Sequence, residues 1–246
     1  MTRVHSPRES GFVDRGLRHG QRDYRYQLFR SRGERPERGW PLILFLHGAG
    51  ERGRDGLLPT QVGVGTAIRR HVDRSPGLVV FPQLGGGRGW SQPDAAELAM
   101  ACLAHSRQDE TVDPARIYLN GISMGGTGVW YLGARYPDLF AALVPVCGGV
   151  NYPAAASGDP AADQNLAIYQ ARAAAIGQTP VWAFHGADDP IVAVDFTRQM
   201  ISTLHRLGSP VRYTEYQACG HDIWEPAYGE SELWRWLFGQ CRESRT

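Results

Sequence analysis

The sequence contains no lysine, so all 26 of its basic residues are arginine. They are balanced by 25 acidic residues, and the formal net charge is only +1. This balance argues against a nucleic acid or an anionic membrane as a partner, because both attract a large excess of positive charge. Ten arginines fall between Arg3 and Arg38, but acidic residues are interspersed with them. We therefore interpret that segment as a solvated edge of the fold rather than a basic arm.

Cysteine is scarce, and no apolar run is long. The four cysteines show no metal-binding or redox spacing such as C-x-x-C, so we expect reduced thiols, no metal and no cofactor. No stretch approaches the roughly 18 apolar residues of a membrane span. The basic N-terminus is not followed by the apolar segment of a secretory signal, which predicts a cytoplasmic protein.

The length of 246 residues and an apolar content of 42% fit one domain with a substantial core. Short β-rich runs alternate with longer helical segments, which predicts a mostly parallel sheet covered by helices on both faces. The expected strands are 11–18, 23–30, 42–46, 78–81, 116–119, 142–146, 181–184 and 211–216. The expected helices are 61–71, 94–105, from Ser123 to about Tyr136, 164–175, 194–207 and 231–241. We expect residues 1–246 to form one domain, with 1–20 as an irregular or edge-strand arm and 150–163 as an excursion above the sheet.

The segment Gly121–Gly125 carries the pattern G-x-S-x-G, with Ser123 at its centre. The pattern alone is weak in a chain with 30 glycines, but here it joins an apolar strand to a helical run. That context is typical of a strained turn that presents a nucleophilic serine at the sheet edge. The following helix directs its N-terminal N–H groups toward the serine and favours negative charge there. We predict that Ser123 is a nucleophile; the alternative is a simple helix N-cap.

An earlier strand leads directly into His47, Gly48, Ala49 and Gly50. In the fold with this serine turn, an oxyanion hole uses one N–H from such a loop and one from the residue after the nucleophile. We therefore expect the N–H groups of Met124 and Ala49 to form it, with Gly50 as the alternative to Ala49. His47 lies on the wrong loop for a catalytic base, and we expect it to brace the loop.

A serine nucleophile of this kind is followed along the chain by an acid and then by a histidine. Two histidines, His205 and His221, lie far enough beyond Ser123. His221 follows the last expected strand, whereas His205 lies inside an amphipathic helix, so we predict His221 as the general base. The acid should follow the strand 181–184, which gives Asp189 or, as the second choice, Asp188.

Together these segments resemble the carboxylesterase and predicted-peptidase branch of the α/β-hydrolase family, near phospholipase/carboxylesterases and feruloyl-esterase-like enzymes. The residues that carry the resemblance are Leu46–Gly53, Asn120–Gly126, His185–Pro190 and Gly220–Trp224. The resemblance implies an α/β-hydrolase fold. We expect no large lid domain, because the segment 150–163 is too short and too irregular to form the helical lid of a lipase. The resemblance also implies Asp189 as the acid and a serine hydrolase that cleaves a small-molecule carboxylic ester through an acyl-serine intermediate.

The substrate is less constrained than the chemistry. We expect an open site for short-chain or small aromatic esters, with Trp90, Trp224 and Gly50 as substrate-binding residues. Alternatively, Trp224 packs under the His221 loop and Trp90 caps a helix. Two other functions stay open at this point: a serine peptidase of the prolyl-oligopeptidase type, and a hydrolase-fold binding protein without catalysis.

Overall fold

In the computed structural model, residues 9–72, 77–150 and 166–242 are described. They form an eight-stranded sheet in the order β1-β2-β4-β3-β5-β6-β7-β8. The strands are β1 (Gly11–His19), β2 (Arg22–Arg30), β3 (Trp40–Leu46), β4 (Leu78–Phe81), β5 (Val112–Ile122), β6 (Ala142–Val146), β7 (Val181–Gly186) and β8 (Val211–Tyr216). Strand β2 runs antiparallel to β1 and β4, and every other pair is parallel. The predicted, mostly parallel sheet is therefore confirmed.

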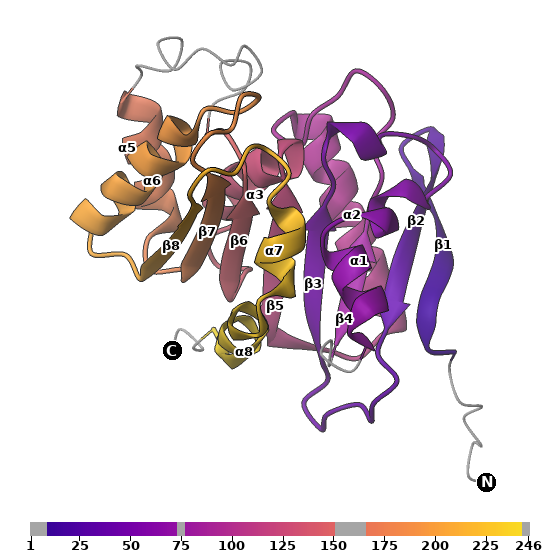
Figure 1. Cartoon of the computed structure of the whole chain (residues 1–246). Helices are drawn as coiled ribbons and strands as arrows, with labels where there is room; N and C mark the ends of the chain where they lie inside the picture. The colour runs from indigo at the N-terminus through magenta and orange to yellow at the C-terminus, as the bar shows by residue number, and fades with distance from the viewer. Residues whose placement is uncertain (1–8, 73–76, 151–165, 243–246) are drawn as a thin grey trace, which may run out of the picture.

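Helices cover both faces of this sheet. They are α1 (Val64–Arg70), α2 (Pro93–Asp109), α3 (Met124–Arg135), α5 (Leu166–Ile176), α6 (Val194–Arg206), α7 (Trp224–Gly229) and α8 (Ser231–Gly239), with short 3₁₀ turns η1 (Ala49–Glu51) and η2 (Leu58–Gln61). Figure 1 shows α1, α7 and α8 in front of the strands and α2 and α3 behind them. No helix in the described part of the chain combines the length and the apolar character needed to cross a membrane.

Successive side chains along each strand point to opposite faces of the sheet, and this divides the core into two layers. In β3, Leu42 and Leu44 join the cluster that contains the inner faces of α2, α3, α5 and α6. Their neighbours Ile43 and Phe45 join the cluster under α1, α7 and α8. Every residue of β3 is buried, because successive side chains point to opposite faces and both faces are covered.

The structure differs from the sequence prediction at several element ends. The expected helix 61–71 is divided into η2 and α1, because Gly63 between them has a φ of 53°, which lies outside the range of a right-handed helix. Strand β5 begins at Val112 rather than 116, since its pairing with β3 continues across an irregular register near Trp40. Helix α7 was not expected. The excursion 150–163 lies, apart from the buried Val150, outside the described residues.

The N-terminal arm is an ordered edge strand, because β1 pairs along its whole length with β2. Its arginines are mostly exposed and form ion pairs such as Arg18 with Asp23 and Arg25 with Asp14, which fits a solvated edge. Arg30 is buried and pairs with Glu110, and the half-buried Arg15 lies beside the same carboxylate. Composition could not reveal this pair, because its partner lies 80 residues further along the chain.

Candidate active site

Ser123 stands between the end of β5 and the start of α3, with φ 52° and ψ −117°. A positive φ is uncommon for a residue with a Cβ and costs on the order of 1–3 kcal/mol. The surrounding hydrogen bonds hold this conformation: the Ser123 N–H donates to the Val146 carbonyl at 2.8 Å, and its carbonyl accepts from the Thr127 N–H at 3.0 Å. The residue therefore forms the sharp strand–turn–helix junction that the sequence predicts.

The turn is possible because its neighbours lack side chains. A Cβ added to Gly125 would lie 1.9 Å from the Leu46 carbonyl oxygen, and one added to Gly121 would lie 2.5 Å from the Gly125 carbonyl oxygen. Both distances are far below van der Waals contact, so any larger residue would push the turn away from β3. Close packing therefore requires glycine at both positions.

The structure brings Ser123, His221 and Asp189 into one line of hydrogen bonds. The Nε2 atom of His221 lies 2.8 Å from Ser123 Oγ, and its Nδ1 atom lies 2.6 Å from Asp189 Oδ2. A carboxylate can only accept, so Nδ1 carries the proton and Nε2 is free to accept from the serine hydroxyl. This tautomer is the one that a general base for Ser123 needs.

Asp189 is held as a carboxylate. Its side chain is 0% exposed. Burial by itself would raise the pKa of Asp189, but hydrogen bonds from His185, His221 and the N–H groups of Val192 and Ile191 hold that pKa well below its usual range. Oδ1 accepts from the N–H groups of Ile191 at 2.8 Å and Val192 at 2.9 Å. The negative charge is thus fixed beside the His221 ring.

His185 is a member of the site that sequence reasoning missed. Its ring is fully buried, and its Nε2–H donates to Asp189 Oδ2 at 3.1 Å and to the Val192 carbonyl at 2.9 Å. Its Nδ1 then accepts from the Thr197 hydroxyl at 2.8 Å. Asp189 is therefore held by two histidines. The sequence signals are that His185 lies near the end of the strand, four residues before Asp189, and that it opens the segment His185–Pro190, which carries the family resemblance.

Cys147 supports the other side of the His221 loop. It directly follows β6 and has a φ of 51°, and its thiol donates to the His221 carbonyl at 3.1 Å. Ligand atoms of Cys147, Asp189 and His221 lie within 4.8 Å of one another. Burial and, second, the nearby Asp189 charge raise the pKa of the Cys147 thiol, which keeps it protonated. Since metal ions bind the thiolate, this group is better suited to positioning His221 than to holding a metal.

A cavity of about 300 Å³ opens beside Ser123. Its lining is mostly apolar or small, with one charged side chain: Ala49, Arg52, Gly89, Trp90, Ser91, Ser123, Met124, Thr127, Ile191 and Val192. Met124 is the first residue of α3, where backbone N–H groups have no partner within the helix. Ala49 opens η1 on the facing loop. The two expected oxyanion donors therefore border one cavity with the serine.

The three predicted substrate-binding residues lie in different surroundings. Trp90 borders the cavity but is fully buried, and its indole N–H donates to the His47 carbonyl at 2.9 Å. Trp224 stands edge-on to the His221 ring, with ring centroids 5.7 Å apart. Within the described residues, neither Trp224 nor Gly50 lines this cavity. Trp224 thus takes the packing position that was the open alternative, and its contact with substrate stays a prediction.

His47 braces the loop that carries Ala49. Its buried ring accepts at Nε2 from the Leu84 N–H at 3.0 Å and bonds through Nδ1 to the Gly48 carbonyl. Burial, opposed only in part by that carbonyl bond, lowers the pKa of His47 from 6.5 to about 4. The expected bracing role is consistent with a neutral imidazole that links two loops.

This shift predicts a pH-dependent stability. Between pH 6.5 and about 4 the unfolded His47 binds more protons than the folded one, so stability present above pH 6.5 is lost as the pH falls. The His47 contribution to the free energy of unfolding should fall by about 3 kcal/mol over this window. Urea unfolding across the window should show the wild-type curve approaching that of H47Q as the pH falls. H205Q, which removes an exposed histidine, is the control, and a wild-type curve parallel to that of H47Q would refute the claim.

Comparison with known proteins supports this fold. The family model of the prolyl oligopeptidase family (Peptidase_S9) matches residues 87–239. An uncharacterized secreted protein of Arthroderma benhamiae is 30% identical over 209 residues, which cover 74% of this chain and 21% of that protein. Poly(3-hydroxyalkanoate) depolymerase C of Paucimonas lemoignei is 37% identical over 122 residues, which cover 44% of this chain and 28% of that protein.

Among solved structures, the crystal structure of a thermostable esterase is 31% identical and superposes with a TM-score of 0.80. The match covers 94% of this chain and 63% of the esterase, so the chain spans less than two thirds of each relative described here. The expected α/β-hydrolase fold is confirmed by this superposition and by the sheet described above. Because the family match extends over more than half of the chain and includes Ser123, Asp189 and His221, the chain belongs to the prolyl oligopeptidase family.

Proposed function

We propose that this chain is a serine hydrolase that cleaves carboxylic esters through an acyl intermediate on Ser123. The observation that carries the proposal is the unbroken chain of hydrogen bonds, 2.8 Å from Ser123 Oγ to His221 and 2.6 Å from His221 to Asp189. The strained backbone of Ser123 and the neighbouring N-terminus of α3 add support, because both recur where a serine attacks a carbonyl group. Likeness to a thermostable esterase points in the same direction.

In the proposed mechanism, His221 Nε2 takes the hydroxyl proton as Ser123 Oγ forms a bond to the ester carbonyl carbon. The carbonyl oxygen becomes negative and accepts from the N–H groups of Met124 and Ala49. The C–O bond to the alcohol then breaks, and the imidazolium returns its proton to the leaving oxygen. Asp189 stabilises the imidazolium throughout. A water molecule, deprotonated by the same imidazole, releases the acid and restores the serine.

The choice between the two aspartates can be tested by substitution. D189N is expected to lower kcat by about 10⁴, because an amide cannot stabilise the imidazolium and favours the wrong tautomer. The side chain of Asp188 is exposed, and D188N should be far milder. Steady-state kinetics on p-nitrophenyl acetate measure both variants. A larger loss in D188N than in D189N would move the role to Asp188.

We propose short-chain or small aromatic esters as substrates. Support comes from the small cavity and from Ile191, an apolar side chain that is 58% exposed at its rim. Such a rim offers apolar contact to a short acyl group or an aromatic ring but does not enclose a long chain. Trp90, Trp224 and Gly50 remain the proposed substrate contacts.

The expected order of kcat/KM is therefore p-nitrophenyl acetate or butyrate above palmitate, without a jump when the substrate forms micelles. A methyl cinnamate-type ester should be accepted as well. The panel is measured above and below the micellar limit of each substrate. Values that rise with chain length, or that jump at an interface, would contradict the open site.

A serine peptidase is the second candidate, and the match to the prolyl oligopeptidase family is the observation that favours it. The same triad geometry serves amides and esters, so the pocket decides between them. A matched pair of substrates that differ only in an ester or amide bond separates the two functions. A non-catalytic binding protein, the third possibility, would not react covalently with a fluorophosphonate.

We further propose that residues 1–246 act as one catalytic domain in the cytoplasm. A single continuous sheet supports one domain, and four unpaired cysteines support a location in the cytoplasm. One relative is named as a secreted protein, so cell fractionation should include the culture medium. Recovery of the protein mainly from the medium would contradict the cytoplasmic assignment.

A further inference from the structure

A second cavity, of about 520 Å³, lies beside the β1–β2 hairpin. It is lined by Arg22, Asp23, Tyr24, Arg25, Gly53, Arg54, Gln83, Gly85, Gly86 and Arg88. Strand β2 is antiparallel to β4, and Gln27 pairs with Phe81 at the end of β4. Residues 22–25 therefore project beyond the carboxyl edge of the sheet, the edge that also carries Ser123. We call this space the arginine cavity.

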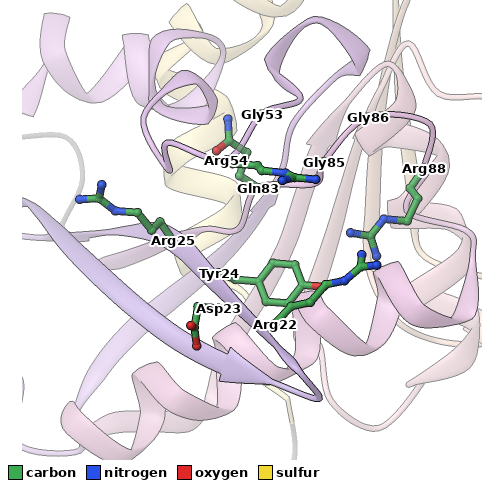
Figure 2. Close-up of a pocket in the computed structure, with 10 residues that line it drawn as sticks. All are labelled: Arg22, Asp23, Tyr24, Arg25, Gly53, Arg54, Gln83, Gly85, Gly86 and Arg88. Carbon is green, nitrogen blue, oxygen red and sulfur yellow. The ribbon is translucent and has the colours of Figure 1, made fainter.

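The charges that face the arginine cavity are positive (Figure 2). Figure 2 shows Arg22 and Arg88 both directed toward the hydroxyl end of Tyr24, and Arg54 extended toward the loop at Gly85. The other two charged residues point away: Arg25 pairs with Asp14 at 3.1 Å, and Asp23 pairs with Arg18 at 3.4 Å. The cavity thus presents three guanidinium groups and no inward carboxylate among the described residues.

Two of these arginines lack an acidic partner. Neither the Arg22 side chain nor the Arg54 side chain forms an ion pair or hydrogen bond within the described part of the chain. Arg88 is 20% exposed, pairs with Asp94 at 2.8 Å and is directed toward the Tyr24 hydroxyl. Like charges that face one cavity repel each other, and the repulsion is relieved when an anion binds between them. The arrangement is therefore suited to a group with several acceptor oxygens.

The floor of the cavity is rigidly built. Gln83 is buried, and its side-chain amide accepts from the Gly56 N–H at 2.6 Å and donates to the Glu51 carbonyl at 3.0 Å. The Gly53 N–H donates to the Leu84 carbonyl at 2.9 Å. These bonds fix the loop that carries Arg54 against the loop that follows β4. A fixed floor reduces the entropy that the site loses when it binds a ligand.

The arginine cavity and the Ser123 cavity share the same two loops. On one loop, Arg52 lines the Ser123 cavity and its neighbour Gly53 lines the arginine cavity. On the other loop, Gly89 lines the Ser123 cavity and its neighbour Arg88 lines the arginine cavity. The Arg52 guanidinium joins the loops, because its Nε donates to the Arg88 carbonyl at 2.9 Å and its Nη2 contacts Met124 Sδ at 2.9 Å. A molecule that extends from Ser123 over Arg52 would therefore reach Arg54 and Arg88.

We propose that the arginine cavity binds a carboxylate or phosphate group of the ester substrate, at a distance from the bond that Ser123 cleaves. That the anion belongs to an ester substrate rests on the proposed esterase function. That the cavity binds an anion does not depend on that function. Guanidinium groups match both anions through paired hydrogen bonds. The substrate class is then an ester whose acyl or alcohol part carries an anionic group.

The first experiment measures anion binding without catalysis. Inorganic phosphate and glutarate are titrated into the wild-type protein, R22Q/R54Q and R32Q/R35Q by isothermal titration calorimetry. The last variant removes the same charge from exposed positions outside the cavity. Wild type and R32Q/R35Q should bind, and R22Q/R54Q should lose about tenfold or more in affinity, since it lacks two guanidinium groups that donate charge-assisted hydrogen bonds to the anion. Equal binding by the two double variants, or none by the wild type, would overturn the site.

The second experiment asks whether the anion is part of the substrate. The substrates are pairs of esters in which one member ends in a carboxylate and the other in the neutral carboxamide. One series of pairs carries this end group on the acyl part and a second series carries it on the alcohol part, and each series increases in chain length. At one chain length in one of the two series, the wild type should prefer the carboxylate ester over its carboxamide partner by about tenfold in kcat/KM. R22Q/R54Q should lose this preference. If anions bind but no pair shows a preference, the substrate assignment is wrong. If no ester is cleaved at all, the proposed function fails, while the titration still decides the anion site.

Discussion

Replacing Ser123 with alanine is expected to lower kcat for p-nitrophenyl acetate by about 10⁴ to 10⁶, the usual loss when a member of such a triad is removed. In the proposed mechanism the serine supplies the oxygen that attacks the carbonyl carbon, and no other hydroxyl forms a hydrogen bond to His221 among the described residues. The alanine variant keeps the glycines that allow the tight turn, so its circular dichroism spectrum should match the wild type. S202A, a change at an exposed position on α6, is the matched control. Turnover by S123A at near the wild-type rate would overturn the assignment.

Loss of the base should have an effect of similar size. H221A is expected to lower kcat by about 10⁴ to 10⁶, because the serine hydroxyl then has no group to accept its proton. His205, the other histidine that the sequence offered, is exposed on α6 and has no hydrogen bond to Ser123, so H205A should retain activity. The same assay measures both variants. An active H221A together with an inactive H205A would show that the wrong histidine was chosen.

The parts of the fold that sequence predicts best are those that one segment determines by itself. Strands β4, β6 and β8 have the expected limits, because a continuous or alternating apolar run bounded by glycine or proline marks a strand locally. Helix α3 ends at Arg135, just before the predicted limit, since Pro137 disfavours helical backbone at the residue that precedes it. The serine turn could be predicted for the same reason, as its glycines and its strand are neighbours in sequence.

What the sequence could not reveal depends on contacts between distant segments. The bond from Cys147 to the His221 carbonyl joins residues 74 positions apart. The Arg52 bridge between the two cavities depends on the loop after β4, 36 residues further along. His185 is close to Asp189 in sequence, but its hydrogen bond to that carboxylate depends on the direction in which the end of β7 points the His185 side chain. Periodicity and motif spacing carry no information of this kind.

The family match itself leaves the substrate open. It begins at residue 87, so the proposed oxyanion loop, Arg52 and Arg54, and the β1–β2 hairpin all lie before it. The residues that form the proposed nucleophile, base and acid lie inside the match, whereas most of the arginine cavity lies outside it. The proposed substrate specificity therefore rests mostly on loops that lie before the family match.

The claim that Ser123 is a nucleophile activated by His221 is tested most directly by covalent labelling. The wild-type protein, S123A and H221A are treated with a fluorophosphonate, and intact mass and peptide maps are recorded by mass spectrometry. We expect one phosphonyl group on the wild-type protein, on the peptide that contains Ser123, and no adduct on either variant over the same time. An unlabelled wild-type protein, or a stoichiometric adduct on a different residue, would contradict the account.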